Sequence, residues 1–284
     1  MRKLTLILTS LSTLMLFGCG SNAATSSPPS QNNTKMTSKP TTPKLKQQNV
    51  ALTVLPGGRL GPDGKMHDTF TTPNFTVVAG VPVKLSVYNY DSGKHSVTSG
   101  ALHLNLVAKG STKNGVPAIT TATFTAAKAG KYIWQCMEAC DGQNGGWAMT
   151  HMGYMRGTIN VVPYANKQYI YMMIKDSLHY AAADKKIHDS YSPTSFNVQA
   201  NIPVQATVEN FDTGQHSFTD PGLNINHVFS GGKKVGDPSL TTFTFTPKKA
   251  GTYSWRCIIP CDGQNKGWAM NHNGYMMGSV KVTP

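Results

Sequence analysis

The chain repeats itself. Residues 67–161 align with residues 188–282 at a constant offset of 121, without an insertion or deletion, and 47 of the 95 aligned pairs are identical. Self-similarity over such a length indicates two copies of one structural unit. A length of 284 residues also suits two domains of ordinary size. We therefore expect two similar domains in tandem, at residues 50–163 and 164–284.

Within each copy, apolar residues alternate with polar ones. The clearest stretches are residues 81–88 and 202–209, and a period of two is typical of a half-buried strand. Residues 121–125, 132–136 and 158–162 read as further strands, and no amphipathic helical stretch is evident. Short strands separated by Gly, Asn, Asp and Pro turns predict an all-β chain of two tandem Greek-key β-sandwiches.

The N-terminus has the pattern of a targeting segment. Arg2 and Lys3 precede an apolar run over residues 4–17, which is too short to span a bilayer. Residues 1–18 therefore read as a signal peptide. Leu16-Phe17-Gly18-Cys19 resembles a bacterial lipobox, and this resemblance implies that Cys19 carries a lipid anchor on the extracytoplasmic face of the cell membrane; simple secretion is the alternative.

Residues 19–49 read as a flexible linker, because they are rich in Ser, Thr, Pro, Asn and Gln and contain no aromatic residue.

The whole chain carries 26 Lys+Arg against 13 Asp+Glu, a net charge of +13. The basic residues are spread along the chain without a nucleic-acid-binding motif. We therefore expect no nucleic-acid partner, and the mean hydropathy of −0.27 excludes a polytopic membrane protein.

The residues that could bind metal recur in both copies. Beyond Cys19, the cysteines form two C-x3-C pairs, and six of the nine histidines and four methionines also pair at the offset. These pairs are Cys136/Cys257, Cys140/Cys261, His67/His188, His95/His216, His151/His272, Met149/Met270 and Met155/Met276. The best-matched stretch is the loop over residues 136–155 and its twin over 257–276. Since loops usually vary more than framework, we infer that something other than packing preserves it.

Thiolate, imidazole and thioether groups together are soft ligands that suit copper. The loop supplies Cys136, His151 and Met155, so a further imidazole must come from elsewhere in the sandwich. His95 and its twin His216 follow alternating strands, where a turn could aim the ring at the cysteine loop. The sequence thus predicts a copper site in each domain.

These segments resemble cupredoxins, and specifically the copper domain of cytochrome c oxidase subunit II. The similar segments are Asp212-Thr-Gly-Gln-His216, Trp134-Gln-Cys136-Met-Glu138-Ala-Cys140 and Met155-Arg-Gly-Thr. The resemblance implies a CuA-like or type 1 copper centre that relays electrons, with one or two ions per domain. It implies a redox partner such as a cytochrome or terminal oxidase. The implied ligands are His95, Cys136, Cys140, His151, Met155 and the Glu138 carbonyl, and His216, Cys257, Cys261, His272, Met276 and the Ile259 carbonyl.

Three alternatives remain at this point. Each C-x3-C pair could form a disulfide in a metal-free sandwich, or the protein could store or deliver copper. The third is catalysis, as in multicopper oxidases or nitrite reductases, which carry a His beside the copper Cys. Here the neighbours are Gln135 and Met137, and Arg256 and Ile258, so we expect an electron carrier and no enzyme.

The remaining aromatic and imidazole groups read as structural. We expect His67 and His188 to be structural, and Trp147 and Trp268 to plug the ends of the sandwiches. The unpaired histidines, His103, His179 and His227, read as surface or turn residues.

Overall fold

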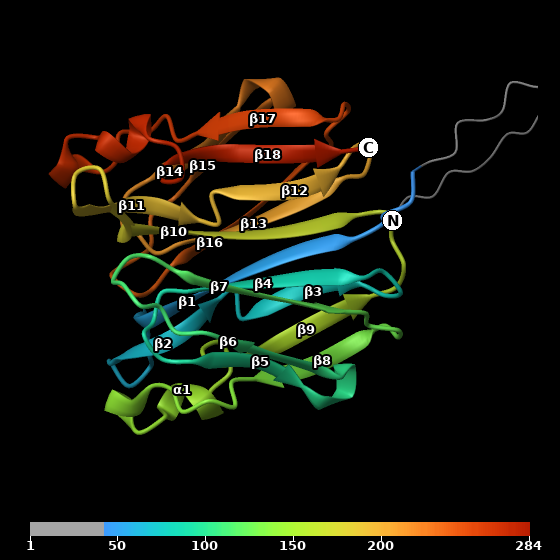
Figure 1. The fold of residues 1–284 in the computed structure, drawn as a ribbon, viewed down its shortest axis with the longest axis horizontal. Coiled ribbons are helices and arrows are strands. Elements are labelled where there is room, and N and C mark those ends of the chain that lie inside the picture. Colours follow the sequence, from blue (N-terminus) through green and yellow to red (C-terminus); the bar gives the residue numbers. More distant parts are fainter. Residues whose placement is uncertain (1–42) are drawn as a thin grey trace, which may run out of the picture. The chain divides into compact units, whose positions relative to one another are not determined.

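The computed structural model describes residues 43–284, which form two β-sandwiches (Figure 1). The fold class predicted from the sequence is therefore confirmed. The signal peptide, Cys19 and the linker up to residue 42 lie outside the described residues. Residues 43–47 precede the first strand, and Leu45 among them is already buried. Residues 43–49 of the segment that the sequence predicts as a linker are therefore part of the folded sandwich.

The first sandwich contains two sheets, with strand orders β2-β1-β4-β7 and β3-β9-β8-β5-β6. Its strands are β1 (Gln48–Leu60), β2 (Met66–Thr71), β3 (Asn74–Val78), β4 (Val83–Asn89), β5 (His95–Ser99), β6 (Leu104–Ala108), β7 (Ala118–Phe124), β8 (Gly130–Gln135) and β9 (Arg156–Val162). Short helical turns are η1 (Gly100–Leu102), η2 (Gly142–Asn144) and α1 (Trp147–Thr150).

The second sandwich repeats this arrangement, with strand orders β11-β10-β13-β16 and β12-β18-β17-β14-β15. Its strands are β10 (Gln168–Ala181), β11 (Lys186–Ser192), β12 (Ser195–Gln199), β13 (Val204–Asn210), β14 (His216–Asp220), β15 (Ile225–Phe229), β16 (Ser239–Phe245), β17 (Gly251–Arg256) and β18 (Met277–Thr283). Its short turns are η3 (Pro221–Leu223), η4 (Gly263–Asn265) and η5 (Trp268–Asn271).

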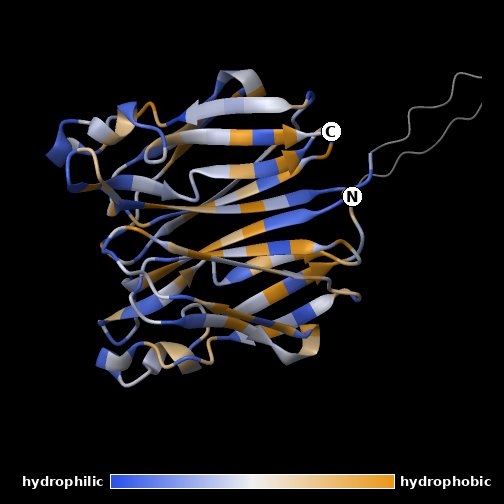
Figure 2. Cartoon of the chain, viewed as in Figure 1, coloured by the Kyte–Doolittle hydropathy of each residue, from blue (hydrophilic) through white to orange (hydrophobic). Residues whose placement is uncertain are grey.

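Each sandwich has a hydrophobic core, as the alternating pattern requires. Hydrophobic and hydrophilic residues alternate along several of the strands (Figure 2). Along β4, Val83, Leu85 and Val87 are buried and the residues between them are more exposed. A fully buried Trp134 of β8 holds the connection between β2 and β3, because its indole N–H donates to the carbonyl of Pro73 at 2.8 Å. Gly157 lies against the same carbonyl, where a Cβ atom would come within 1.8 Å of the oxygen.

The repeat extends further towards the N-terminus than the sequence comparison shows. β1 and β10 begin with Gln48 and Gln168, whose side-chain amides donate to equivalent carbonyls in the two sandwiches. These two residues differ by 120 positions rather than 121. The hairpin of β10 and β11 therefore contains one residue more than that of β1 and β2, since Arg59 pairs with His67 and His179 with His188, and this insertion hides the equivalence of the first strands.

The two sandwiches pack through β1 and β10, which lie side by side (Figure 1). The contacts are reciprocal: Leu60 N–H donates to Gly236 O at 2.8 Å, and Tyr180 N–H donates to Gly115 O at 2.9 Å. Leu60 and Tyr180 are structural equivalents, as are Gly115 and Gly236. Such pairing is that of an isologous dimer interface, here within one chain.

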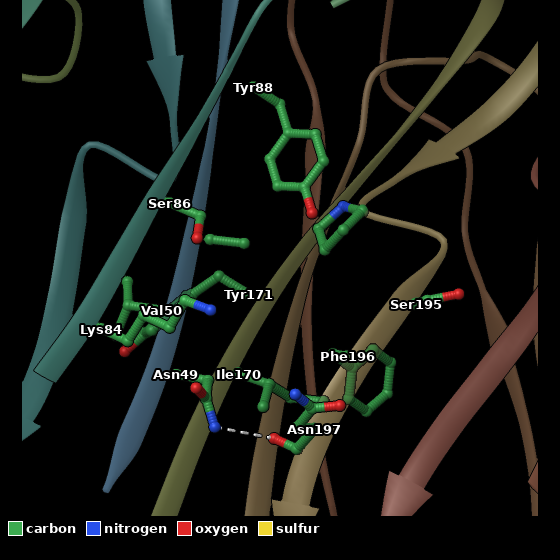
Figure 3. Close-up of a pocket in the computed structure, with 12 residues that line it drawn as sticks. Asn49, Val50, Lys84, Ser86, Tyr88, Ile170, Tyr171, Ser195, Phe196 and Asn197 are labelled. Atoms are coloured by element: carbon green, nitrogen blue, oxygen red, sulfur yellow. Dashed lines mark hydrogen bonds between the residues drawn. The ribbon is translucent and has the colours of Figure 1, made fainter. Parts of the chain in front are cut away.

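A shallow pocket lies along this interface (Figure 3). Asn49 and Lys84 line it from the first sandwich, and Tyr171, Phe196 and Asn197 from the second. The amide of Asn49 donates to the carbonyl of Asn197 at 3.2 Å across the pocket.

Among residues 43–284, no helix has the length and hydropathy needed to cross a bilayer.

Candidate metal centres

His95, Cys136 and Cys140 meet in the first sandwich, with their ligand atoms within 4.8 Å of one another. The two sulfur atoms are 3.1 Å apart, and His95 Nδ1 is 3.9 Å from Cys136 Sγ. All three residues are buried. A first-row metal ion binds nitrogen and sulfur at roughly 2.0–2.3 Å, so these donors are close enough to share an ion.

Two strands of one sheet set this geometry. β5 begins at His95, and β8 ends at Gln135, one residue before Cys136. Ser96 then joins the two chain segments, since its backbone N–H donates to Cys136 Sγ at 3.3 Å and its hydroxyl accepts from the N–H of Met137 at 2.8 Å. The thiol is thus fixed by backbone hydrogen bonds as well as by packing.

Asp91 fixes the imidazole. Its carboxylate binds His95 Nε2 at 2.7 Å, which leaves Nδ1 facing the thiol. Burial lowers the pKa of His95, but the bonds to Asp91 and Cys136 outweigh it and raise that pKa to about 9. A carboxylate behind an imidazole is a common outer-shell partner of metal-binding histidines, because it sets the tautomer and the ring orientation.

The thiols differ strongly in acidity. The hydrogen bond from Cys140 lowers the pKa of Cys136 to about 4; burial opposes this shift, and His95 and the Ser96 N–H support it. The neighbouring thiolate, followed by burial, raises the pKa of Cys140 well above its usual range. One thiolate and one thiol therefore share the group, and the thiolate is the form that binds metal.

Glu138 and Met155 are the further residues that the sequence predicts as donors. The carbonyl of Glu138 is 3.6 Å from Cys136 Sγ and 3.2 Å from Cys140 Sγ. Met155 is fully buried in the same core as the cysteines, and its carbonyl accepts from the N–H of Cys136 at 2.8 Å. The Glu138 carbonyl thus borders both thiols, and the backbone of Met155 is bonded to that of Cys136.

The second sandwich reproduces the arrangement. His216, Cys257 and Cys261 form the equivalent group, with His216 Nδ1 3.9 Å from Cys257 Sγ. The supporting bonds match within 0.1 Å: Asp212 binds His216 Nε2 at 2.8 Å, and the N–H of Ser217 donates to Cys257 Sγ at 3.3 Å. The Ile259 carbonyl lies 3.4 Å from Cys257 Sγ, and Met276 is fully buried.

The structure does not bring His151 and His272 to these groups. The His151 ring is exposed and stacks on Trp147 at a centroid distance of 3.5 Å. Its Nδ1 forms a hydrogen bond with the backbone carbonyl of Trp147 at 2.7 Å. His272 and Trp268 repeat this stack, also at 3.5 Å. The ten residues between Cys140 and His151 form two short turns, and these carry the imidazole out to the surface.

Asp141 organises those turns. Its buried carboxylate accepts from the N–H of Ala148 and the amide of Asn144, and it binds His67 Nδ1 at 2.8 Å. Asp63 binds the other nitrogen of His67 at 3.0 Å. His67 is therefore a fully buried structural residue, as the sequence predicts, and it stacks on the inner face of Trp147. Trp147 is thus held between two imidazoles beside the loop.

The sequence analysis did not single out Asp91, Ser96 or Asp141. Each recurs at the offset, as Asp212, Ser217 and Asp262, and that identity was the available signal. The structure also corrects one prediction: His179 is a partly buried interface residue, in contact with Tyr90 and Tyr275. The alternative of a disulfide in each pair is not the state of this structure, where all four cysteines of residues 43–284 are free.

Comparison with known proteins gives structural matches alone. No family model matches the chain, and no curated protein matches it. One solved structure that resembles it is a copper nitrite reductase from Nitrosomonas europaea, 14% identical, with a TM-score of 0.31, over 84% of this chain and 94% of that one. A multicopper oxidase is 11% identical, with a TM-score of 0.30, over 84% and 89%.

A blue copper oxidase from Nitrosomonas europaea is 13% identical, with a TM-score of 0.29, over 84% of this chain and 86% of that one. The names of all three matched structures are those of copper proteins. They contradict the prediction that the chain is no enzyme, because the proteins named are enzymes.

Proposed function

We propose that each sandwich binds copper through its His/Cys/Cys group and that the chain transfers electrons. The observation that carries the proposal is the recurrence of one pre-set group in both halves. Each has an imidazole nitrogen 3.9 Å from a thiol, a carboxylate behind the imidazole and an N–H directed at the sulfur. Packing of the core alone does not require the same arrangement of imidazole, thiol, carboxylate and N–H in both sandwiches.

The donors fit copper. Two sulfur atoms and an imidazole nitrogen form a soft donor set that favours copper over the hard cations, and a buried methionine adjoins it. Bound copper would supply a centre that accepts and releases one electron. The chain's own residues prepare for it: Asp91 orients His95, the Ser96 N–H stabilises the Cys136 thiolate, and the surrounding core excludes water.

Rigidity of the group supports electron transfer. Strands β5 and β8 hold the imidazole and thiol, and hydrogen bonds fix both side chains. Donors that cannot rearrange keep the energetic cost of a change in charge low, which favours rapid electron exchange. Storage or delivery, the alternative, requires ligands that release the ion readily.

The full chain loaded with copper provides the test. We expect strong visible absorption from sulfur–copper bonds, which bleaches on reduction and returns on oxidation. Cys136→Ser should remove the contribution of the first sandwich and Cys257→Ser that of the second, each halving the bound copper. The hyperfine pattern of the Cu(II) spectrum distinguishes one ion from a mixed-valence pair in each site. Colourless Cu(I) that passes readily to a chelator would instead indicate storage or delivery.

We further propose that the chain works on the extracytoplasmic face of a bacterial membrane, anchored through Cys19, and exchanges electrons with a cytochrome or terminal oxidase. The leader pattern and the exposed Met137 and Ile258 beside the copper cysteines support this proposal. Incorporation of labelled palmitate, abolished by Cys19→Ser, tests the anchor. Recovery of the wild-type chain in the soluble fraction would contradict it.

A further inference from the structure

The two candidate centres are connected by a continuous series of bonded and packed groups across the interface between the sandwiches. The line starts at the first centre, where His95 Nε2 binds the carboxylate of Asp91 at 2.7 Å. Tyr90 is the residue immediately before Asp91 in the chain. Its ring packs against a buried cluster built from both sandwiches, formed by Leu55, Met173, Leu178 and Phe211.

Tyr90 reaches into the second sandwich. Its hydroxyl is 3.0 Å from His179 Nδ1, and the two rings meet edge to face. Burial lowers the pKa of His179 and raises that of Tyr90. The imidazole is therefore neutral near pH 7, and its Nδ1 can accept a hydrogen bond from the phenol, which keeps its proton.

The line ends at the second centre. The His179 ring lies 5.1 Å from the Tyr275 ring, at an interplanar angle of 85°. Tyr275 is followed by Met276, whose carbonyl accepts from the N–H of Cys257 at 2.8 Å. Every link from His95 to Cys257 is thus a covalent bond, a hydrogen bond or a contact between aromatic rings.

Because the interface is reciprocal, each sandwich offers an equivalent set of residues. The opposite arm, which is the set formed by Phe211, Arg59 and Tyr154, lacks this connection. Phe211 stands at the position of Tyr90, and strand register places Arg59 at that of His179, since Arg59 pairs with His67 as His179 pairs with His188. Arg59 is held by Glu209 at 2.9 Å and lies over the Phe211 ring, which has no hydroxyl to donate. The two arms have diverged at the residues that make the link.

We propose that Tyr90, His179 and Tyr275 form the path by which the two centres exchange electrons. The proposal rests on the proposed function. With copper bound, one electron would pass from the reduced centre of one sandwich to the oxidised centre of the other; no covalent bond would form or break, and no proton would cross. Electronic coupling is stronger through bonded and packed groups than across gaps, so this arm carries the transfer.

The test measures electron equilibration between the centres of the copper-loaded full chain after a pulse of external reductant. Cys136→Ser and Cys257→Ser provide the spectrum of each centre. We expect a phase independent of protein concentration, slowed at least tenfold by Tyr90→Phe, which removes one hydroxyl. His179→Gln, which removes the ring, should slow it as well. Tyr154→Phe removes a hydroxyl from the opposite arm and should leave the rate within twofold of wild type.

A second measurement uses the metal-free chain. The ¹⁵N shift of His179 Nδ1 should show a hydrogen-bonded acceptor that is lost in Tyr90→Phe. If that bond is absent, or if both centres cycle normally and Tyr90→Phe equilibrates at the wild-type rate, the path is wrong and the proposed function stands. If the chain takes up no redox-active copper, the proposed function fails and the path falls with it.

Discussion

Asp91 lies four residues before His95, and its carboxylate binds the far nitrogen of the imidazole at 2.7 Å. The pair recurs as Asp212 and His216 at 2.8 Å. In both sandwiches the nitrogen that faces the thiol is therefore chosen by a residue that is not itself a ligand. This outer position gives the first prediction.

Asp91→Ala should weaken copper binding at the first centre by roughly 10–100-fold, the usual effect of removing an outer-shell partner. The second centre should keep its affinity, and Asp212→Ala should reverse the pattern. Competition with a Cu(I) chelator, read separately for each centre, measures both. Equal weakening of both centres by one substitution would point to a general loss of stability instead.

His95 and His151 should differ as ligands. The sequence predicts both, but only His95 lies at the thiols. His95→Ala should lower copper affinity by more than about 100-fold, beyond the effect of an outer-shell change, and His151→Ala by less than about 10-fold. Chelator competition on the two variants decides the matter. A large loss in His151→Ala would mean that the loop carries His151 to the centre when copper binds.

Removing one member of the ion pair between Arg59 and Glu209 should lower the free energy of unfolding much more than replacing both members. Burial raises the pKa of Glu209 although Arg59 opposes the shift, which shows that the carboxylate is poorly solvated. Glu209→Leu should cost about 3 kcal/mol in the free energy of unfolding, because it strands the guanidinium. Arg59→Met combined with Glu209→Leu should return close to wild type. Denaturant unfolding of the metal-free chain measures all three proteins.

His67 should make stability depend on pH. Burial lowers its pKa, but the bonds to Asp141 and Asp63 outweigh burial and leave the pKa raised above 6.5. Its stabilisation is therefore complete below pH 6.5 and is lost as pH rises through the raised value. The pKa of Asp63 is lowered, chiefly by its bond to His67, so that side of the pair is lost only as pH falls below 3.8.

The stability difference between wild type and His67→Gln should therefore be greatest between about pH 4 and 6.5. Unfolding of both metal-free proteins across pH 3–9 tests this. A difference that stays constant over the whole range would show that packing against Trp147, rather than charge, accounts for the role of His67.

Much of the fold followed from local patterns. The duplication and the period-two alternation predicted two sandwiches, and the repeated cysteines and His95 predicted where ligands gather. The position of His151 could not be predicted, because it depends on how Asp141 folds the intervening turns. The interface role of His179 could not be predicted for another reason. The structurally equivalent residue of the first sandwich is Arg59, which is not a histidine, and a one-residue insertion shifts the two positions out of alignment.

The reciprocal contacts of Leu60 with Gly236 and of Tyr180 with Gly115 have a lasting consequence. A pair of separate, identical subunits comes apart on dilution, and every mutation appears in both members. Fused in one polypeptide, the halves stay together at any concentration, and each can change without the other. Such freedom allows one side of the interface to carry the hydrogen bond between Tyr90 and His179 while the equivalent side carries the ion pair between Arg59 and Glu209.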